Sequence, residues 1–155
     1  MSLEPVLQSI YPPMTRPQAR STLYRLIEAG QLARKALLVP LLDRGLEPGD
    51  DAVLFVLHSE LGATEERLAA ELGIDAAQLQ PRLERLIERD VVVRQAIGPD
   101  LAPGLALTER GARIREVLAA NWEQLEEALF DDLNDKKRKT LGKALKRLVE
   151  LLRLA

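Results

Sequence analysis

The sequence contains no cysteine and only one histidine, His58, among its 155 residues. The lack of cysteine excludes disulfide bonds, thiol catalysis and redox sensing by a thiol. One histidine without any cysteine does not provide a structural zinc site. Neither a Gly-x-Ser-x-Gly elbow nor a glycine-rich phosphate loop occurs in the sequence. We therefore expect a protein that is not an enzyme and that binds no metal or cofactor.

Aromatic residues and long apolar runs are also scarce. Aromatic residues make up 3% of the chain and apolar residues 46%, so the core must be aliphatic. No segment reaches the ~18 consecutive apolar residues of a membrane span. The first residues lack the basic start and the extended apolar core of a signal peptide. These features predict a mostly helical, cytoplasmic protein that does not enter a membrane.

The sequence has no excess of positive charge, since its formal net charge is −2. A strongly basic chain would favour nucleic acid as a partner. A small dimeric DNA-binding protein can instead concentrate its positive charge on one surface. The net charge therefore neither supports nor excludes DNA binding.

The middle of the chain has the pattern of two helices joined by a tight turn. Thr64 can cap a first helix, and Gly73 permits the left-handed turn that ends it. Asp75 can cap a second, longer helix. Apolar residues at helical spacing give this second helix a buried face: Leu79, Leu83, Leu86 and Ile87.

Two short apolar runs follow this pair of helices. Residues 91–93 are three valines, and residues 105–107 form a second apolar run. Glycine and proline residues lie between the two runs, which together predict a β-hairpin. Thr108 can cap the helix that follows the hairpin.

Long amphipathic helices are predicted on both sides of this central stretch. We expect a first helix over 16–44, capped by Thr15, and further helices over 48–60 and 108–133. A last helix, capped by Asn134 or Asp135, should end near Leu154. The last helix has an apolar stripe of Leu141, Leu145, Leu148 and Leu152. The terminal helices have more apolar surface than a monomer of this size easily covers, so we expect a two-fold homodimer.

Three segments carry a resemblance to a known family. They read LAAELGID over 68–75, RLERLIERDVVVR over 82–94 and LALTERG over 105–111. In this order and spacing they resemble the MarR family of bacterial transcription regulators, over about residues 16–154. The resemblance implies a mostly α fold with a central winged helix-turn-helix and long N- and C-terminal dimerisation helices.

The resemblance also implies how one domain, residues 1–155, is divided. Residues 46–111 would form the winged helix DNA-binding lobe, in which Gly62 and Ala63 add a short strand to the wing. Residues 15–45 and 112–155 would form the dimerisation lobe. The implied function is transcription regulation by binding a palindromic site in double-stranded DNA, under the control of a small-molecule effector.

The resemblance places the candidate DNA-binding residues on the second helix of the motif and on the wing. Gln78 and Gln80 can pair with adenine, and Ala77 can contact a thymine methyl group. The basic candidates are expected to hold phosphates, or alternatively to form a solvated face paired with Glu84 and Glu88: Arg82, Arg85, Arg89 and Arg94.

Two features depart from the family pattern. Pro81 stands where an arginine is common, and Asp100 is followed by Leu101 and Ala102 where the family has a wing arginine. Only Arg94 is basic between Val91 and Leu107. The alternative hypothesis is therefore a dimeric regulatory or scaffolding protein whose winged helix no longer binds DNA.

Effector binding is implied by the same resemblance, since family members often bind small aromatic acids between their two lobes. Polar-tipped groups on the helices that would line this crevice are Tyr24, His58 and Trp122. Each of them could instead be an ordinary core or interface residue. The basic run 136–139 is interpreted as solvated surface.

Overall fold

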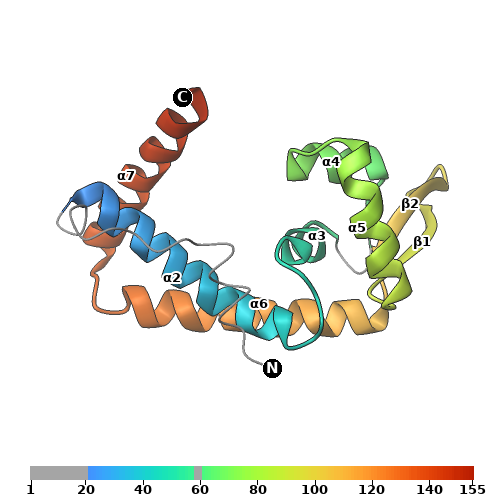
Figure 1. Cartoon of the computed structure of the whole chain (residues 1–155), viewed down its shortest axis with the longest axis horizontal. Coiled ribbons are helices and arrows are strands. Elements are labelled where there is room, and N and C mark those ends of the chain that lie inside the picture. Colours follow the sequence, from blue (N-terminus) through green and yellow to red (C-terminus); the bar gives the residue numbers. More distant parts are fainter. Residues whose placement is uncertain (1–20, 58–60) are drawn as a thin grey trace. The chain divides into compact units, whose positions relative to one another are not determined.

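The computed structural model describes residues 21–57 and 61–155. These residues form six α-helices and two β-strands with the following bounds: α2 (Thr22–Leu42), α3 (Asp50–Val56), α4 (Glu65–Leu72), α5 (Ala76–Glu88), β1 (Val92–Ile97), β2 (Ala102–Leu107), α6 (Glu109–Phe130) and α7 (Asp135–Leu154) (Figure 1). The chain divides into two compact units, Met1–Asn121 and Trp122–Ala155. The mostly helical fold class predicted from the sequence is confirmed.

Helix α2 begins later than expected. Ser21 is extended (φ −77°, ψ 149°), and its hydroxyl accepts a hydrogen bond from the amide of Tyr24 at 2.9 Å. A single helix from Arg16 is therefore wrong, and the expected cap, Thr15, lies outside the described residues. The end is as predicted, because Gly45 is left-handed (φ 72°) and Leu46 behind it is buried.

Helix α3 is shorter than expected. It starts after Gly49 and ends at Val56, because Leu57 is extended (φ −82°, ψ 109°). The prediction that it continues to Glu60 is wrong from Leu57 onward. His58 falls in the part of the chain that the structure does not describe.

The pair α4 and α5 forms the helix-turn-helix. Thr64 accepts a hydrogen bond from the amide of Arg67 at 3.2 Å and caps α4. Gly73 is left-handed (φ 68°) and ends it. Asp75 caps α5 and forms a reciprocal capping box with Gln78. All three end signals predicted from the sequence are confirmed.

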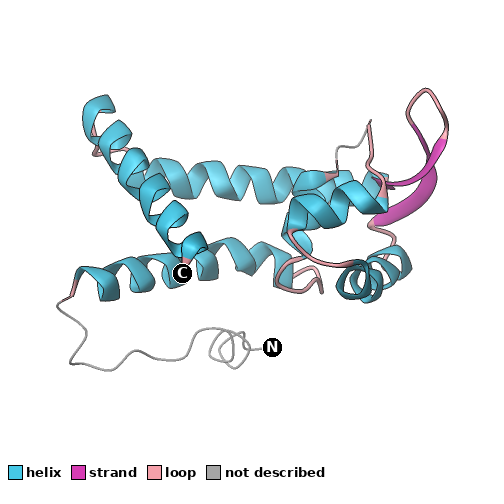
Figure 2. Ribbon diagram, turned by 90° about the horizontal axis from the view of Figure 1, so that it is seen from above, coloured by secondary structure: helices cyan, strands magenta, loops and turns pink. Residues whose placement is uncertain are grey.

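The wing is an antiparallel hairpin of β1 and β2, seen in Figure 2 as the two magenta strands. Its register pairs Val92 with Leu107 and Ile97 with Ala102. Ala63 adds an isolated bridge to Leu105, through bonds of 2.9 and 2.8 Å in the two directions. The expected short third strand of the wing thus exists as this bridge.

The Thr108–Gly111 turn joins the wing to α6. The Thr108 hydroxyl donates to the carbonyl of Asp90 at 2.5 Å and accepts from the amide of Gly111 at 3.0 Å. A Cβ on Gly111 would lie 2.1 Å from the carbonyl oxygen of Val91, so only glycine fits. The Leu-Thr-x-x-Gly segment is therefore a structural device that closes the hairpin onto the following helix.

The core of the first unit is aliphatic, as composition predicted. Its fully buried large residues are leucines and valines from α2 to β2, and Ile114 and Leu118 of α6 complete the cluster. No aromatic side chain of the described residues is among the buried ones. The core fixes α4, α5 and the wing as one support for the candidate interface.

The second unit holds the end of α6 and the whole of α7. Asn134 caps α7 by accepting from the amide of Lys137 at 2.9 Å, which confirms one of the two predicted caps. No residue of α7 is buried within the single chain. The apolar stripe of α7 therefore remains uncovered, and Leu152 is 65% exposed. None of the helices that the structure describes is long and apolar enough to cross a bilayer.

Candidate nucleic-acid interface

The outer face of α5 is the surface that a helix-turn-helix offers to DNA. Leu79, Leu83 and Leu86 turn inward and are buried. The opposite face exposes neutral and acidic residues: Ala77, Gln78, Pro81, Glu84 and Glu88. Arg82 and Arg85, two of the candidates for phosphate contacts, are only partly exposed, at 27% and 21%, and lie on the flank of this face.

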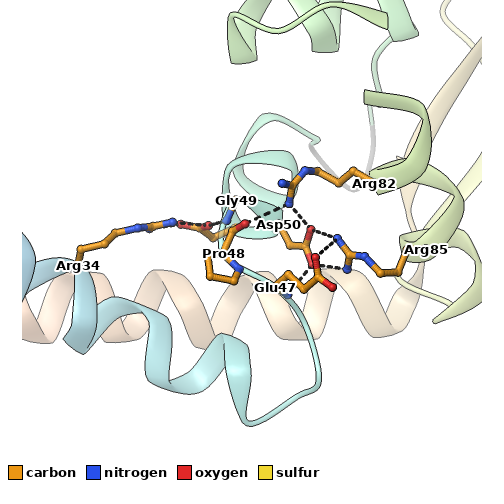
Figure 3. A network of polar contacts seen from close by, with 8 residues as sticks. Arg34, Glu47, Pro48, Gly49, Asp50, Arg82 and Arg85 are labelled. Carbon is orange, nitrogen blue, oxygen red and sulfur yellow. Dashed lines mark hydrogen bonds and ion pairs between the residues drawn. The ribbon is translucent and has the colours of Figure 1, made fainter. Parts of the chain in front are cut away.

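Asp50 is the reason for that placement. It is the only charged residue that is fully buried in the described part of the chain, at 0% exposure. Arg82 donates to its Oδ1 at 2.6 Å, and Arg85 donates to both of its oxygens at 2.7 Å. The amide of Glu47 completes the shell at 2.7 Å from Oδ2. Figure 3 shows both arginines reaching from α5 to the start of α3.

This Asp50 cluster (Glu47, Asp50, Arg82, Arg85) satisfies a buried charge completely, with two hydrogen bonds to each oxygen. A buried carboxylate without such partners would be strongly unfavourable. The hydrogen bonds and charge of Asp50 raise the pKa of Arg85 although burial opposes this. The two arginines thus hold α5 against α3, and the alternative pairing with Glu84 and Glu88 is not found among the described residues.

Gly49 also belongs to this arrangement. Its φ of 98° favours glycine. A Cβ on Gly49 would lie 2.9 Å from the Arg82 guanidinium nitrogens. The glycine thus leaves room for the arginine to pass over the backbone and reach Asp50.

A neighbouring ion pair fixes α3 to α2. Arg34 donates to the two oxygens of Asp51 at 2.5 and 2.9 Å. Burial acts to raise the pKa of Asp51, but the hydrogen bonds and charge of Arg34, with the amide of Gly49, lower it on balance. The first turn of α3 is therefore held from two sides.

A second acidic residue, Glu65, binds side chains on the other flank of α5. Glu65, in the first turn of α4, accepts a hydrogen bond from Gln80 Nε2 at 2.6 Å and forms an ion pair with Arg94 of β1. The hydrogen bond from Arg94 is the main reason that the pKa of Glu65 is lowered, and Gln80 adds to it. This Glu65 cluster (Glu65, Gln80, Arg94) connects α4, α5 and the wing. Glu65 and Arg94 also line an open hollow of about 460 Å³ beside the wing.

The two clusters lie on different sides of α5. Residues two apart on an α-helix are separated by about 200° around its axis, and Gln80 and Arg82 are such a pair. Four of the seven candidate DNA-binding residues therefore form contacts with acids of the same lobe. Their side chains position α5 and the wing, and sequence patterns gave no sign of it because the acids lie 15 to 35 residues away.

The remaining three candidates are placed differently. Ala77 is exposed, and Gln78 uses its amide oxygen to accept from the amide of Asp75 at 3.1 Å. The amide nitrogen of Gln78 is thereby directed away from the cap. Arg89 is exposed, with its guanidinium 2.6 Å from where a Cβ on Gly45 would lie. Arg89 is thus the arginine among the candidates that has no acidic partner within the described residues.

The effector site formed by Tyr24, His58 and Trp122 stays a prediction. Tyr24 is half-buried on α2 in the first unit, and Trp122 is 49% exposed in the second. His58 lies outside the described residues. In the part of the chain that the structure describes, no cluster of histidine or acidic side chains could hold a metal ion.

A residue that sequence reasoning missed is Arg115 on α6. Its guanidinium lies 5.8 Å from the centre of the Phe55 ring on α3. Its Nε atom is buried and has no hydrogen-bond partner among the described residues. Nothing in the local sequence distinguishes this arginine from its exposed neighbours Arg110 and Arg113.

Comparison with known proteins identifies the fold. No protein-family model and no curated protein sequence matches the chain. Solved structures do match over most of its length. CouR from Rhodococcus jostii RHA1 bound to p-coumaroyl-CoA has a TM-score of 0.67 at 23% identity, covering 86% of this chain and 95% of that chain.

Two further structures agree. A structure of MarR has a TM-score of 0.64 at 26% identity, covering 92% of this chain and 97% of that chain. CouR bound to a 23-mer DNA duplex has a TM-score of 0.66 at 21% identity, covering 88% and 99%. The chain therefore has the winged helix-turn-helix fold of the MarR-family transcriptional regulators.

Proposed function

We propose that the chain is a transcription regulator that binds double-stranded DNA as a homodimer. Residues 46–111 act as the DNA-binding lobe, and residues 15–45 with 112–155 act as the dimerisation lobe. The observation that carries the proposal is the exposed start of α5, held between α4 and a β-hairpin. Support comes from the structural neighbours, one of which is bound to a DNA duplex.

In this function α5 enters a major groove and the wing follows the adjacent backbone. Ala77, Gln78 and Gln80 contact base edges, and Arg89 contacts phosphate. Because Arg82, Arg85 and Arg94 are paired within the lobe, few phosphates are neutralised. Affinity is therefore modest and depends weakly on salt, since each neutralised phosphate contributes about −0.9 to the salt slope.

Fluorescence anisotropy with a palindrome selected from random oligonucleotides tests the proposal. The wild type should prefer the palindrome to a scrambled duplex at two salt concentrations. Ala77→Glu should weaken binding at least about tenfold, because it places a negative charge in the groove. The control Ala70→Glu makes the same change at an exposed position of α4 and should change binding less than about threefold. Equal effects of the two variants would contradict the proposed interface.

The second candidate function is a dimeric regulatory scaffold that does not bind DNA. The pairing of the arginines in the Asp50 and Glu65 clusters favours it, since little positive charge remains at the outer face of α5. Equally weak binding to both duplexes at low salt would establish this candidate over the first.

We also propose an acidic effector, held by Arg115 beside Phe55. A buried guanidinium nitrogen without a partner is an uncompensated donor, which a carboxylate would satisfy. One structural neighbour is bound to p-coumaroyl-CoA. An aromatic acid would place its ring against Phe55 and its carboxylate on Arg115.

Thermal unfolding with a panel of small aromatic carboxylates tests the effector. A ligand at ~100 times its dissociation constant would add about 2.7 kcal/mol of stability. Arg115→Met should abolish the increase in melting temperature, whereas Arg113→Met, at an exposed position of α6, should preserve it. An increase that survives Arg115→Met would exclude Arg115 as the anchor.

A further inference from the structure

The carboxylate of Glu65 holds one side chain of α5 and one of the wing, on the flank of the candidate DNA surface. Its Oε2 accepts from Gln80 of α5 and its Oε1 from Arg94 of β1. The side chain of Glu65 is 31% exposed and that of Arg94 is 51% exposed, so both lie at the surface of the lobe. The adjacent Glu66 is exposed and forms no hydrogen bond or ion pair among the described residues.

We propose that Glu65 determines base specificity by fixing the amide of Gln80, so that Gln80 presents its oxygen to bases that carry an amino group. The proposal rests on the DNA-binding function proposed above. Glu65 itself contacts no base and acts as a positioning residue. The same carboxylate keeps Arg94 from the phosphate backbone.

The chemistry of the two side chains fixes the orientation. An ionised carboxylate only accepts hydrogen bonds, and the lowered pKa of Glu65 keeps it ionised at neutral pH. The amide nitrogen of Gln80 must therefore face Glu65. Its oxygen, an acceptor, is directed away from the carboxylate, and flipping the amide would bring two acceptors together.

This orientation selects among base edges in the major groove. Adenine offers its N6 amino group and cytosine its N4 amino group as donors, whereas guanine and thymine offer acceptors at O6 and O4. An outward oxygen on Gln80 pairs with the first two and is repelled by the others. Gln78 has the opposite orientation, because its oxygen is held by the amide of Asp75.

Arg94 supplies a second, measurable consequence. It is the only basic residue of the two wing strands and their turn. While it is paired with Glu65 it neutralises no phosphate. Loss of the carboxylate would release one guanidinium per subunit to the DNA backbone.

The test compares Glu65→Gln with Glu66→Gln, which remove the same charge from adjacent positions. Binding of each to the selected palindrome and to all single-base variants of it is measured by anisotropy at several salt concentrations. Gln78→Ala and Gln80→Ala first identify the base pairs that each glutamine reads. Urea unfolding shows that each variant is folded.

On the strand whose base Gln80 contacts, Glu65→Gln should lose at least about fivefold of the preference for adenine or cytosine over guanine or thymine at that position, because the amide can then flip. The preference at the Gln78 base pair should stay unchanged. The salt slope should steepen by about 0.9 for each released Arg94. Glu66→Gln should strengthen binding to all sequences alike and leave both preferences intact.

A double variant makes the test strict. Glu65→Gln combined with Gln80→Ala should show the base preferences of Gln80→Ala alone, since both changes act through one amide. Additive losses, or a preference at the Gln80 base pair that survives Glu65→Gln, would overturn the proposal while leaving DNA binding intact. A wild type that does not distinguish the palindrome from the scrambled duplex would overturn the proposed function and this inference together.

Discussion

At the scale of single residues, replacement of Asp50 by asparagine is expected to destabilise the fold by about 3 kcal/mol. The amide has one acceptor oxygen for four donors, so Arg82 loses its counter-charge and Arg85 keeps only the exposed Glu47, at 3.4 Å. Both arginines are partly exposed, at 27% and 21%, which places the effect at the lower end for buried pairs. Urea unfolding measures the loss, with Glu84→Gln on the exposed face of α5 as the control. A loss below about 1 kcal/mol would show that the arginines are solvated well enough without Asp50.

The ion pair of Asp51 with Arg34 predicts a dependence of stability on pH. The pKa of Asp51 is lowered in the folded state from its ordinary value of 3.8. As the pH falls, the unfolded chain therefore binds a proton at Asp51 before the folded chain does. The stability that the ion pair contributes is complete above pH 3.8 and is lost as the pH falls through the lower pKa of the folded state. Asp51→Asn should accordingly flatten the decline in urea midpoint below about pH 4. Asp100→Asn, in the exposed turn of the wing, should leave the decline unchanged, and equal curves for wild type and Asp51→Asn would contradict the prediction.

Residue-level sequence reasoning succeeded where the cause is local. Thr64, Asp75 and Asn134 cap helices because a short polar side chain can reach an amide three residues ahead. It did not indicate the pairing of Arg82 and Arg85 with Asp50, which is more than 30 residues away. Glu84 and Glu88 have suitable helical spacing, but a buried carboxylate binds the guanidinium groups more strongly than exposed ones do.

At the scale of elements, Gly111→Ala tests how the wing is closed onto α6. The new Cβ would lie 2.1 Å from the backbone oxygen of Val91, so either the hairpin or the helix must move. We expect a loss of at least about 3 kcal/mol in thermal unfolding. The matched control is Gly142→Ala in α7, where nothing lies within 4 Å. This change should be neutral or stabilise by about 1 kcal/mol, because alanine favours helix over glycine. Similar melting temperatures for the two variants would show that the contact at Gly111 is easily relieved.

The elements themselves were predictable, whereas some of their ends were not. Helical periodicity and the valine run placed α4, α5 and the wing correctly, because each buries one face in a shared core. Thr15 and Ser21 are equally good caps in isolation, so the sequence did not indicate that α2 begins at Thr22. The early end of α3 at Val56 has no glycine or proline to mark it.

At the scale of the whole molecule, the uncovered stripe of α7 predicts a dimer. An isolated helix of 20 residues with no buried side chain gains little stability from propensity alone. Sedimentation at micromolar concentration should show a dimer, and Leu145→Asp should convert it to a monomer because the charge would be buried in the interface. Lys143→Asp, a charge change at another exposed position of α7, should leave the dimer intact. A stable monomeric wild type would contradict both this prediction and the proposed dimerisation lobe.

The candidate interface was only partly predictable at this scale. Composition indicated no excess of positive charge, and the helix-turn-helix pattern placed the exposed face of α5. Which of those residues remain available to DNA depends on Asp50 and Glu65, which reach α5 from other elements. Four of the seven candidates contact one of these two acids, so their side chains also hold the lobe together. Tertiary contacts of this kind cannot be read from the local sequence.

The Asp50 cluster also constrains how the sequence could evolve. Asp50, Arg82 and Arg85 depend on one another, and Gly49 must stay small while the Arg82 guanidinium lies 2.9 Å from its Cβ position. A lineage could not gain basic residues for DNA simply by releasing these arginines, since the buried acid would be left alone. The acid would have to be replaced first or at the same time. Gly49 would stay favoured even after Arg82 had been replaced, because its φ of 98° strains any larger residue. Descendants should therefore keep Asp50, Arg82 and Arg85 together or exchange them together.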